Sequence, residues 1–308
     1  MTQNISAGGS LLALSNDLAD AVDRAGRFTV AVHARHRSPS SGVHWRQGVI
    51  VTADHTIRQE DDISVTFPDG RSVAATLAGR DSDTDLAVLK VEAGGVPVAQ
   101  FAGAEELKVG HLVIAVARAG DDGLRASSGV ASAVGGAWRT WRGGHVEQFI
   151  ALDLNLYPGF SGGPLIDSSG GVIGINTSAL SRRFDLTLPV ATVNRVIDQL
   201  LTRGRIARGY LGIGMQPVRL SDALRRAAGV NGDGGAIVVA VEPEGPAERG
   251  GIFVGDIIVA LDGTPIEDTD DVLTQLGSDR VGKALRLRLV RGGAATEVSV
   301  TVGERPQE

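Results

Sequence analysis

The alternation of apolar and polar positions divides the chain into segments with different periods. Residues 9–25 carry apolar side chains at near-helical spacing with acidic residues between them, which is the pattern of an amphipathic helix. We therefore expect an N-terminal helical segment, residues 1–25, ahead of the first domain. Its apolar positions are Leu11, Leu12, Leu14, Leu18, Ala21 and Val22.

From Phe28 to about Ile175, short strand-like runs alternate with turns rich in Gly, Asp and Ser. Many short strands separated by such turns favour an all-β barrel or sandwich over alternating βα units. The runs are Thr29–Val32, Gly48–Val51, Ile63–Phe67, Leu86–Val91, Leu112–Val116 and Val172–Ile175.

A helical period returns over residues 191–203, and Gly204 follows it as a stop signal. We expect this helix to close a first domain of residues 26–204, followed by a short linker. Further strands and an apolar helix around Thr269–Leu276 predict a second domain, residues 207–304. A length of 308 residues is ordinary for two domains. The apolar face of the first helix is Val193, Val196, Ile197, Leu200 and Leu201.

Composition narrows the classes of function. Apolar residues are 43% and charged residues 21%, as in ordinary globular proteins. The net charge of −6 and the lack of a basic stripe argue against nucleic acid as a partner. The absence of cysteine excludes disulfides, cysteine catalysis and thiolate zinc sites. The first residues fit neither a signal peptide nor a membrane span. We expect a cytoplasmic protein as the sequence is written, or a periplasmic or otherwise extracytoplasmic one if a leader has been removed.

Residues 159–163 read Gly-Phe-Ser-Gly-Gly and precede an apolar run. A serine in such a turn exposes its hydroxyl and leaves nearby backbone N–H groups free for an oxyanion, which is what acyl transfer to Ser161 needs. The same residues fit the G-x-S-x-G elbow of α/β-hydrolases. Because the chain has 42 glycines, a turn without chemistry is a further alternative.

The order of the histidines separates these alternatives. All of them precede Ser161, so the Ser–acid–His order of an α/β-hydrolase is excluded. The subtilisin order and the chymotrypsin order, His then Asp then Ser, are both allowed, and the β-rich pattern favours the second. His55 and Asp85 each lie where a predicted strand meets a turn, although either alone also fits a loop histidine or a turn cap. The histidines are His33, His36, His44, His55, His111 and His145.

With these motifs the chain resembles the HtrA/Deg serine proteases, in which a chymotrypsin-like domain precedes PDZ modules. The resemblance runs from about residue 25 to 303, and it implies a mainly β fold: a chymotrypsin-like double β-barrel followed by a small α+β PDZ domain. The motifs that carry it are Gly48-Val-Ile-Val-Thr-Ala-Asp-His55, Asp83-Thr-Asp85-Leu-Ala-Val-Leu-Lys-Val91, Gly129-Val-Ala-Ser132, Gly159-Phe-Ser161-Gly-Gly-Pro-Leu165 and Gly171-Val-Ile-Gly-Ile-Asn176.

The resemblance implies a role for each motif residue. Ser161 would be the nucleophile, His55 the general base and acid, and Asp85 the group that orients and stabilises the imidazole. The N–H groups of Gly159 and Ser161 would form the oxyanion hole. No metal or cofactor is implied.

Two segments depart from the family pattern. Phe160 stands where the family has Asn or Asp, on the predicted oxyanion loop. Asn155 and Leu156 lie where the primary specificity pocket is expected, and Leu156 would favour small or medium aliphatic side chains.

The loop 135–144 corresponds to a region that senses activating signals in the family. Its Trp138 and Trp141 fit that role or simple packing on the barrel equally well.

Residues 207–303 resemble a circularly permuted bacterial PDZ module, on Gly209-Tyr-Leu-Gly-Ile213, Gly245-Pro-Ala247, the run Gly250–Gly263 and Gly282–Arg291. The resemblance implies that the loop of Tyr210, Leu211, Gly212 and Ile213 captures a C-terminal carboxylate while the peptide adds as a β-strand. Val272, Leu273 and Leu276 are spaced to face that groove.

These patterns together predict an ATP-independent serine endopeptidase. Its substrates would be unfolded or misfolded polypeptides in protein quality control, and its PDZ domain would bind C-terminal peptides for regulation or substrate tethering. The alternative is a catalytically silent chaperone or peptide-binding scaffold. The family resemblance also implies a homo-trimer or higher oligomer assembled through the segment before the barrel.

Overall fold

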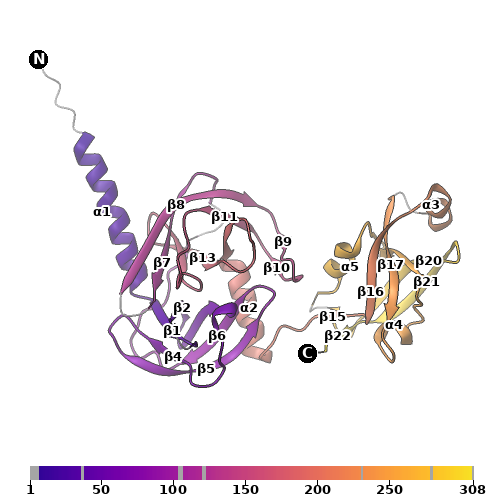
Figure 1. The fold of residues 1–308 in the computed structure, drawn as a ribbon, viewed down its shortest axis with the longest axis horizontal. Helices are drawn as coiled ribbons and strands as arrows, with labels where there is room; N and C mark the ends of the chain where they lie inside the picture. Colours follow the sequence, from indigo (N-terminus) through magenta and orange to yellow (C-terminus); the bar gives the residue numbers. More distant parts are fainter. Residues whose placement is uncertain are drawn as a thin grey trace, which may run out of the picture. The chain divides into compact units, whose positions relative to one another are not determined.

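The computed structural model describes residues 7–35, 38–102, 107–119, 123–229, 232–277 and 280–306 (Figure 1). The chain divides into two compact units, and the boundary falls between Ile206 and Ala207. Residues 1–6 of the predicted N-terminal segment lie outside the described residues, and helix α1 (Ala7–Gly26) occupies the rest of it.

The first unit contains two closed barrels, as the family resemblance implies. The first barrel has the strand order β1-β2-β3-β6-β5-β4. Val30, Ile50, Val65 and Leu89 fill its interior without exposed surface, because alternate residues of a strand point to the same face. Its elements are β1 (Thr29–His33), β2 (Ser40–Arg46), β3 (Val49–Ala53), the 3₁₀ turn η1 (Asp54–Thr56), β4 (Ser64–Thr66), β5 (Ser72–Asp81) and β6 (Leu86–Val91).

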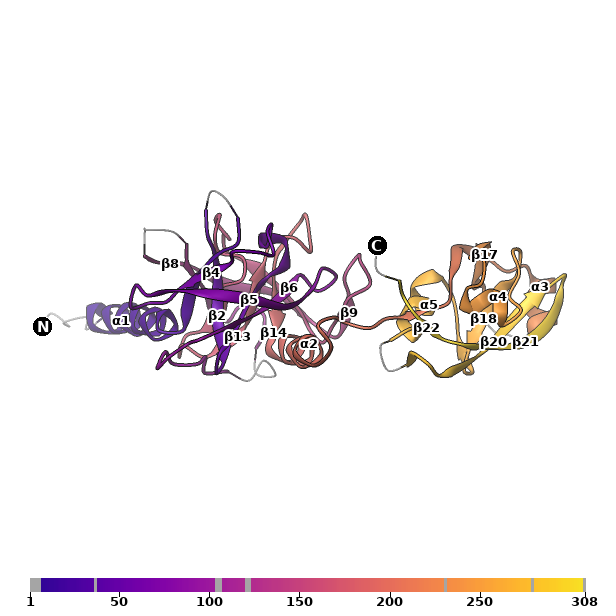
Figure 2. The same cartoon turned by 90° about the horizontal axis from the view of Figure 1, so that it is seen from below.

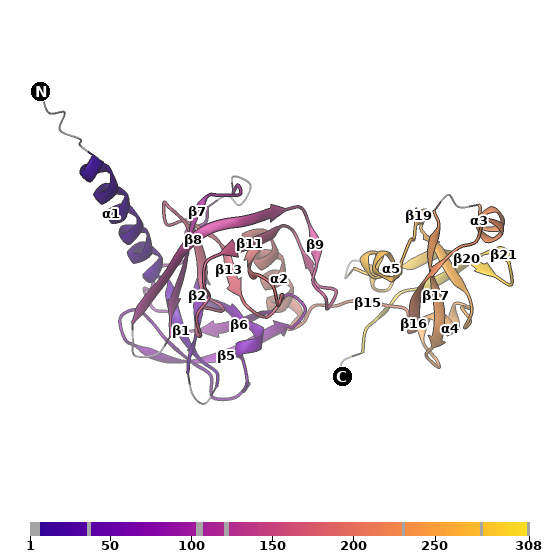
Figure 3. The same cartoon turned by 45° about the horizontal axis from the view of Figure 1, so that its top comes forward.

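The second barrel has the strand order β11-β14-β13-β12-β7-β8. Its interior is built around Ile150, Phe160, Leu165 and Ile173. A two-stranded hairpin, β9–β10, extends from the end of β8 (Figure 3). The strands are β7 (Leu112–Arg118), β8 (Leu124–Gly135), β9 (Trp138–Arg139), β10 (His145–Val146), β11 (Phe149–Asp153), β12 (Pro164–Asp167), β13 (Val172–Thr177) and β14 (Asp185–Pro189).

Helix α2 (Val190–Arg203) packs against strands of both barrels (Figure 2). Its buried Val193, Val196, Ile197 and Leu200 are residues of the predicted apolar face. Gly204 ends the helix in the left-handed conformation, with φ of 70°, and its N–H donates to the carbonyl of Leu200 at 2.8 Å. The predicted stop at this glycine is therefore confirmed.

Helix α1 is anchored to the barrels at its C-terminal end. Ala21 and Ala25 are fully buried against the barrels, whereas Leu11 and Leu12 are 68% and 62% exposed. The N-terminal end of the helix projects away from the barrels (Figures 1 and 3). In the part of the chain that the structure describes, no helix combines the length and the apolar character that crossing a membrane requires.

The second unit is an antiparallel sheet with the order β16-β17-β18-β20-β21, in which β19 pairs with β18. Strand β16 forms one edge of this sheet, and α5 lies beside β16 and β17. The elements are β15 (Gly209–Tyr210), β16 (Ile213–Arg219), α3 (Asp222–Ala228), β17 (Gly234–Val241), α4 (Pro246–Arg249), β18 (Ile257–Leu261), β19 (Thr264–Pro265), α5 (Thr269–Gln275), β20 (Ala284–Arg291), β21 (Ala294–Thr301) and β22 (Gly303–Glu304), which pairs with β15.

A buried histidine links two turns of the first barrel. The His44 side chain accepts a hydrogen bond at Nε2 from the Gly48 N–H, at 3.2 Å. Its Nδ1 lies 2.9 Å from the carbonyl oxygen of Pro97, to which it must therefore donate as a neutral ring. Burial lowers the pKa of His44 below its ordinary value of 6.5, because a charged imidazolium is poorly solvated in the interior.

We predict that His44 reduces stability in acid. The folded-state pKa of His44 lies below its ordinary value of 6.5. As the pH decreases below that value, the unfolded chain binds the proton more readily than the folded protein, so the free energy of unfolding decreases. In NMR titrations, the imidazole signal that disappears in His44→Gln should titrate below 6.5. A titration at or above that value would contradict the prediction.

Candidate active site

His55 and Asp85 are brought together by the pairing of β3 with β6. Ala53 pairs with Leu86 in the antiparallel register, so the residues just beyond these two positions are neighbours. Asp85 accepts the His55 backbone N–H at 2.8 Å. The His55 ring places Nδ1 at 2.8 Å from Oδ2 of Asp85 and 3.0 Å from Oδ1. Because an ionised carboxylate only accepts, Nδ1 carries the proton and Nε2 is left to act as a base.

The second barrel supplies a further contact to Asp85. Thr177, at the end of β13, is buried and donates its hydroxyl to Oδ2 of Asp85. The sequence analysis missed this residue, although it directly follows the motif that ends at Asn176. Donors from both barrels therefore fix the carboxylate, whose side chain is only 4% exposed.

The remaining member of the predicted triad has a different partner. The Ser161 hydroxyl lies 3.2 Å from the hydroxyl of Ser178, and none of the hydrogen bonds of these described residues joins Ser161 to His55. The structure thus brings His55 and Asp85 into direct contact and places Ser161 against the residue that follows Thr177.

The peptide group between Gly159 and Phe160, just before Ser161, is hydrogen-bonded at both its N–H and its carbonyl. The Phe160 N–H donates to the carbonyl of Tyr157 at 3.0 Å, and the Gly159 carbonyl accepts the Ser41 hydroxyl at 2.7 Å. Gly159 has a φ of 95°, as position i+2 of a type II turn requires. The N–H groups of Gly159 and Ser161 have no acceptor among the described residues, so both remain available to an oxyanion.

Phe160 is a core residue. Its side chain is 1% exposed and packs in the interior of the second barrel, with its ring 5.9 Å from that of Tyr157 in an edge-on arrangement. Two residues later, a Cβ at Gly162 would lie 2.3 Å from the carbonyl oxygen of Ser41. The turn around Ser161 is therefore anchored by an aromatic side chain on one side and by close backbone packing on the other.

Comparison with known proteins identifies the domain family of each of the two units. Residues 40–175 match the trypsin-like peptidase domain, and residues 209–302 match the PDZ domain. The serine endoprotease from Yersinia pestis, a solved structure, is 30% identical and covers 94% of this chain and 98% of its own, with a TM-score of 0.76. The HtrA-type protease AlgW, solved with a decapeptide, is 27% identical over 94% of this chain and 99% of its own, with a TM-score of 0.77.

The chain belongs to the HtrA/DegP-like family of serine proteases. The probable periplasmic serine endoprotease DegP-like of Halomonas elongata is 35% identical over 276 residues, which are 88% of this chain and 57% of that protein. The protein of the same name from Brucella suis biovar 1 is 34% identical over 285 residues, 90% of this chain and 54% of that protein. This HtrA-like chain therefore spans little more than half the length of those relatives. The predicted mainly β fold, a double barrel followed by a PDZ domain, is confirmed.

The two residues predicted to line the specificity pocket differ in their exposure to solvent in this HtrA-like chain. Asn155 is exposed, and Leu156 is half-buried against the apolar interior of the second barrel. The Leu156 N–H donates to Oδ2 of Asp185 at 3.0 Å, which ties this segment to the start of β14. The aliphatic preference inferred for Leu156 stays a prediction.

The two tryptophans of the 135–144 loop differ. Trp138 packs edge-on against Phe149, with ring centroids 5.4 Å apart. Trp141 is 71% exposed and its ring lies under the guanidinium of Arg142. Trp138 therefore fits the packing interpretation, and only Trp141 presents its surface to a partner. The sensing role stays a prediction.

In the loop predicted to capture a carboxylate, the backbone carbonyl groups and the backbone N–H groups differ in their hydrogen bonding. The carbonyl oxygens of Leu211 and Gly212 accept hydrogen bonds from Ala247 and Glu242, whereas their N–H groups have no acceptor among the described residues. Tyr210 donates its hydroxyl to Glu242 and Ile213 opens the edge strand β16. The hydrogen bond to Glu242 raises the pKa of Tyr210.

Leu273 of helix α5 is 44% exposed, and Leu276, the residue that follows the end of this helix, is half-buried. The prediction that Val272 faces the groove is wrong, because its side chain is fully buried in the core of the second unit. Helical spacing does not distinguish the face toward a groove from the face toward the core when both are apolar.

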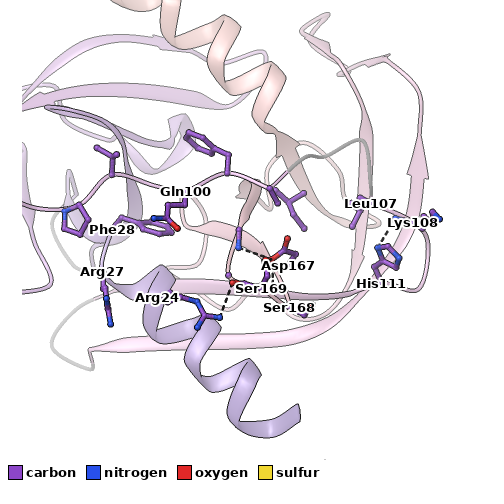
Figure 4. A pocket seen from close by; sticks show the side chains of 17 residues that line it. Arg24, Arg27, Phe28, Gln100, Leu107, Lys108, His111, Asp167, Ser168 and Ser169 are labelled. Atoms are coloured by element: carbon purple, nitrogen blue, oxygen red, sulfur yellow. Dashed lines mark hydrogen bonds between the residues drawn. The ribbon is translucent and has the colours of Figure 1, made fainter. Parts of the chain in front are cut away.

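A cavity of about 990 Å³ lies apart from the predicted triad, between the end of α1 and the turn that joins β12 to β13 (Figure 4). None of the predicted catalytic residues lines it. The described residues also contain no group of three or more side chains that could hold a metal ion.

We predict that Phe160 stabilises the protein far more than its neighbour on the same loop. Phe160→Ala should lower the free energy of unfolding by about 3–5 kcal/mol, as expected for a fully buried ring. Tyr157→Ala is the matched control, because Tyr157 is 50% exposed. Urea unfolding measures both, and equal losses for the two variants would contradict the assignment of Phe160 as a core anchor.

Proposed function

We propose that the first unit is a serine endopeptidase with Ser161 as nucleophile, His55 as base and acid, and Asp85 as the group that orients His55. The observation that carries this proposal is the Asp85 carboxylate, which accepts from His55 Nδ1 and from Thr177. In the neutral ring of His55, this arrangement makes Nε2, on the side away from Asp85, the nitrogen that can accept a proton. A base oriented by a buried carboxylate is the arrangement that activates a serine hydroxyl.

The reaction begins with a rotation of the Ser161 hydroxyl from Ser178 toward Nε2 of His55. Ser161 Oγ then attacks the scissile carbonyl carbon while Nε2 takes its proton, and the negative charge that develops on the carbonyl oxygen is stabilised by the N–H groups of Gly159 and Ser161. The imidazolium is stabilised by Asp85 and returns the proton to the leaving amine. Water attacks the acyl-enzyme by the same route and releases the carboxylate product and Ser161. Every proton is carried by His55, and no cofactor or ATP takes part.

Unfolded or misfolded polypeptides are the substrates that we propose. Ser161 is only 8% exposed, so a scissile bond reaches it only from a segment that can leave its own fold. Exposed, locally mobile segments are the usual sites of proteolytic cleavage. This supports a role in protein quality control for a chain whose relatives are named DegP-like endoproteases.

We also propose that the second unit binds C-terminal peptides, for regulation or for tethering of substrates. Strand β16 is a sheet edge beside α5, and the N–H groups of Leu211 and Gly212 at its start are available to a carboxylate. An added peptide strand would complete the hydrogen bonding of the edge.

The names of the relatives support an extracytoplasmic location. DegP-like relatives of this chain are named periplasmic, and the cytoplasmic expectation from the N-terminal sequence finds no such support. Self-association through the N-terminal segment stays a prediction, for which the exposed Leu11, Leu12 and Leu14 of α1 offer apolar surface.

A fluorophosphonate probe tests the enzyme against the alternative of a silent scaffold. We expect the wild type to be labelled covalently and Ser161→Ala not to be labelled, with mass spectrometry locating the adduct on Ser161. Labelling is measured with and without an added C-terminal peptide. A wild type that remains unlabelled under both conditions would support the scaffold.

The same assay tests the contact between the two serines. Ser178→Ala removes the competing partner of Ser161, so labelling should accelerate by about two- to tenfold, the value of one neutral hydrogen bond. Ser181→Ala is the matched control, because the Ser181 hydroxyl accepts hydrogen bonds from the backbone N–H groups of Arg183 and Phe184 in its own loop. A Ser178→Ala variant that reacts more slowly than the wild type would show that Ser178 assists Ser161 instead.

We predict that the second unit recognises a free carboxylate. In fluorescence polarisation, a labelled peptide ending in valine should bind at least about tenfold more tightly than the same peptide with an amidated C-terminus, because charge-assisted hydrogen bonds are lost. Leu273→Ala should weaken binding, whereas Leu224→Ala on α3 should not, because Leu224 packs in an apolar cluster separate from the one that holds α5. Equal affinity for both peptides would exclude carboxylate capture.

A further inference from the structure

The turn that carries Asp85 needs support from outside itself. Asp85 has a φ of 56°, which lies in the left-handed region that non-glycine residues rarely adopt, and such conformations persist where surrounding contacts hold them. Within the turn, Asp81 accepts the Thr84 hydroxyl at 2.6 Å. At its end, the Asp85 carbonyl accepts the Asp54 N–H at 3.0 Å.

The hairpin β9–β10 contacts the middle of this turn through hydrogen bonds and close backbone packing. Thr140 is 4% exposed and donates its hydroxyl to the carbonyl of Asp83 at 2.7 Å. The same hydroxyl accepts the Gly144 N–H at 3.0 Å. A Cβ at Gly144 would lie 2.5 Å from the Asp83 carbonyl oxygen, so the two backbones are packed directly together. Arg142 adds a bond from Nη1 to the carbonyl of Ser82, at 3.1 Å.

The hairpin is itself fixed on helix α2. Glu147 accepts Nε of Arg195 at 2.6 Å, and its N–H donates to the Thr192 hydroxyl at 3.1 Å. Arg195 also donates from Nη2 to the carbonyl of His145 at 2.6 Å. Because the hairpin is anchored to α2 at one end, it can hold the Asp83 carbonyl in a fixed position at the other end.

We propose that Thr140 is a positioning residue for Asp85, acting through the Asp83 carbonyl. This inference rests on the proposed protease function. Loss of the hydroxyl would remove the hydrogen bond that it donates to the Asp83 carbonyl and the one that it accepts from the Gly144 N–H, and would release the turn two residues before Asp85. The Asp85 carboxylate then meets the His55 ring less closely and stabilises the imidazolium less.

The test compares Thr140→Val, which has the same shape without the hydroxyl, with Thr140→Ser, which keeps it. In Thr140→Val, kcat on a peptide substrate should fall about tenfold with little change in KM. The acid limb of the pH profile of kcat/KM should move to lower pH, because a carboxylate held less closely stabilises the protonated His55 ring less. Thr140→Ser should restore both properties.

Thr29→Val is the matched control for a merely structural effect. Thr29 is also fully buried and donates to a backbone carbonyl, that of Ala25, at 2.8 Å. It should lose stability while the acid limb stays in place. If Thr140→Val behaves like Thr29→Val, or leaves kcat and the acid limb unchanged, the positioning role is overturned.

Two further outcomes are distinguishable. If Thr140→Val does not fold, Arg142→Ala decides the question, because it releases the Ser82 carbonyl from an exposed position. It should move the acid limb in the same direction by a smaller amount, and an unmoved limb would overturn the proposal. A wild type that does not react with the fluorophosphonate would overturn the proposed function together with this inference, whereas an active wild type with an unaffected Thr140→Val overturns this inference alone.

Discussion

The Asp85 carboxylate is the group on which the rest of the candidate site depends. It is almost completely removed from solvent, where an ionised carboxylate is stable only if hydrogen bonds replace its hydration. Those bonds come from His55 of the first barrel and Thr177 of the second. The requirement to solvate one buried charge therefore holds the ends of β3, β6 and β13 together. A change that separates the barrels would expose the carboxylate and lose the orientation of His55 at the same time.

The sequence predicted much of the fold because its signals were local and repeated. The strand runs bounded by Gly and Asp, the apolar face of residues 191–203 and the stop at Gly204 each reflect one element's own chemistry, and α2 ends where that chemistry requires. His55 and Asp85 could be paired because each lies at the end of a strand. No local signal placed these two strands side by side, and the family resemblance supplied that step.

What the sequence did not predict depends on contacts between distant segments. Thr177 looks like any strand threonine until β13 is placed against Asp85. Val272 and Leu273 are adjacent apolar residues on one short helix, and only the packed structure separates the buried one from the exposed one. Phe160 stands where the family pattern has a polar residue, and the sequence did not predict its structural role. In the structure it fills the interior of the second barrel, a role that composition alone could not reveal.

The peptide between Gly159 and Phe160 has a consequence for the time course of catalysis. Its carbonyl is held by Ser41 and its N–H by Tyr157, so a reversal of this peptide would break two hydrogen bonds at once. The turn just before Ser161 is therefore held in one arrangement in the free protein. In the proposed mechanism the first step is a rotation of the Ser161 hydroxyl, a picosecond-to-nanosecond motion, whereas loop rearrangements are orders of magnitude slower. The proposed mechanism therefore predicts turnover without a lag.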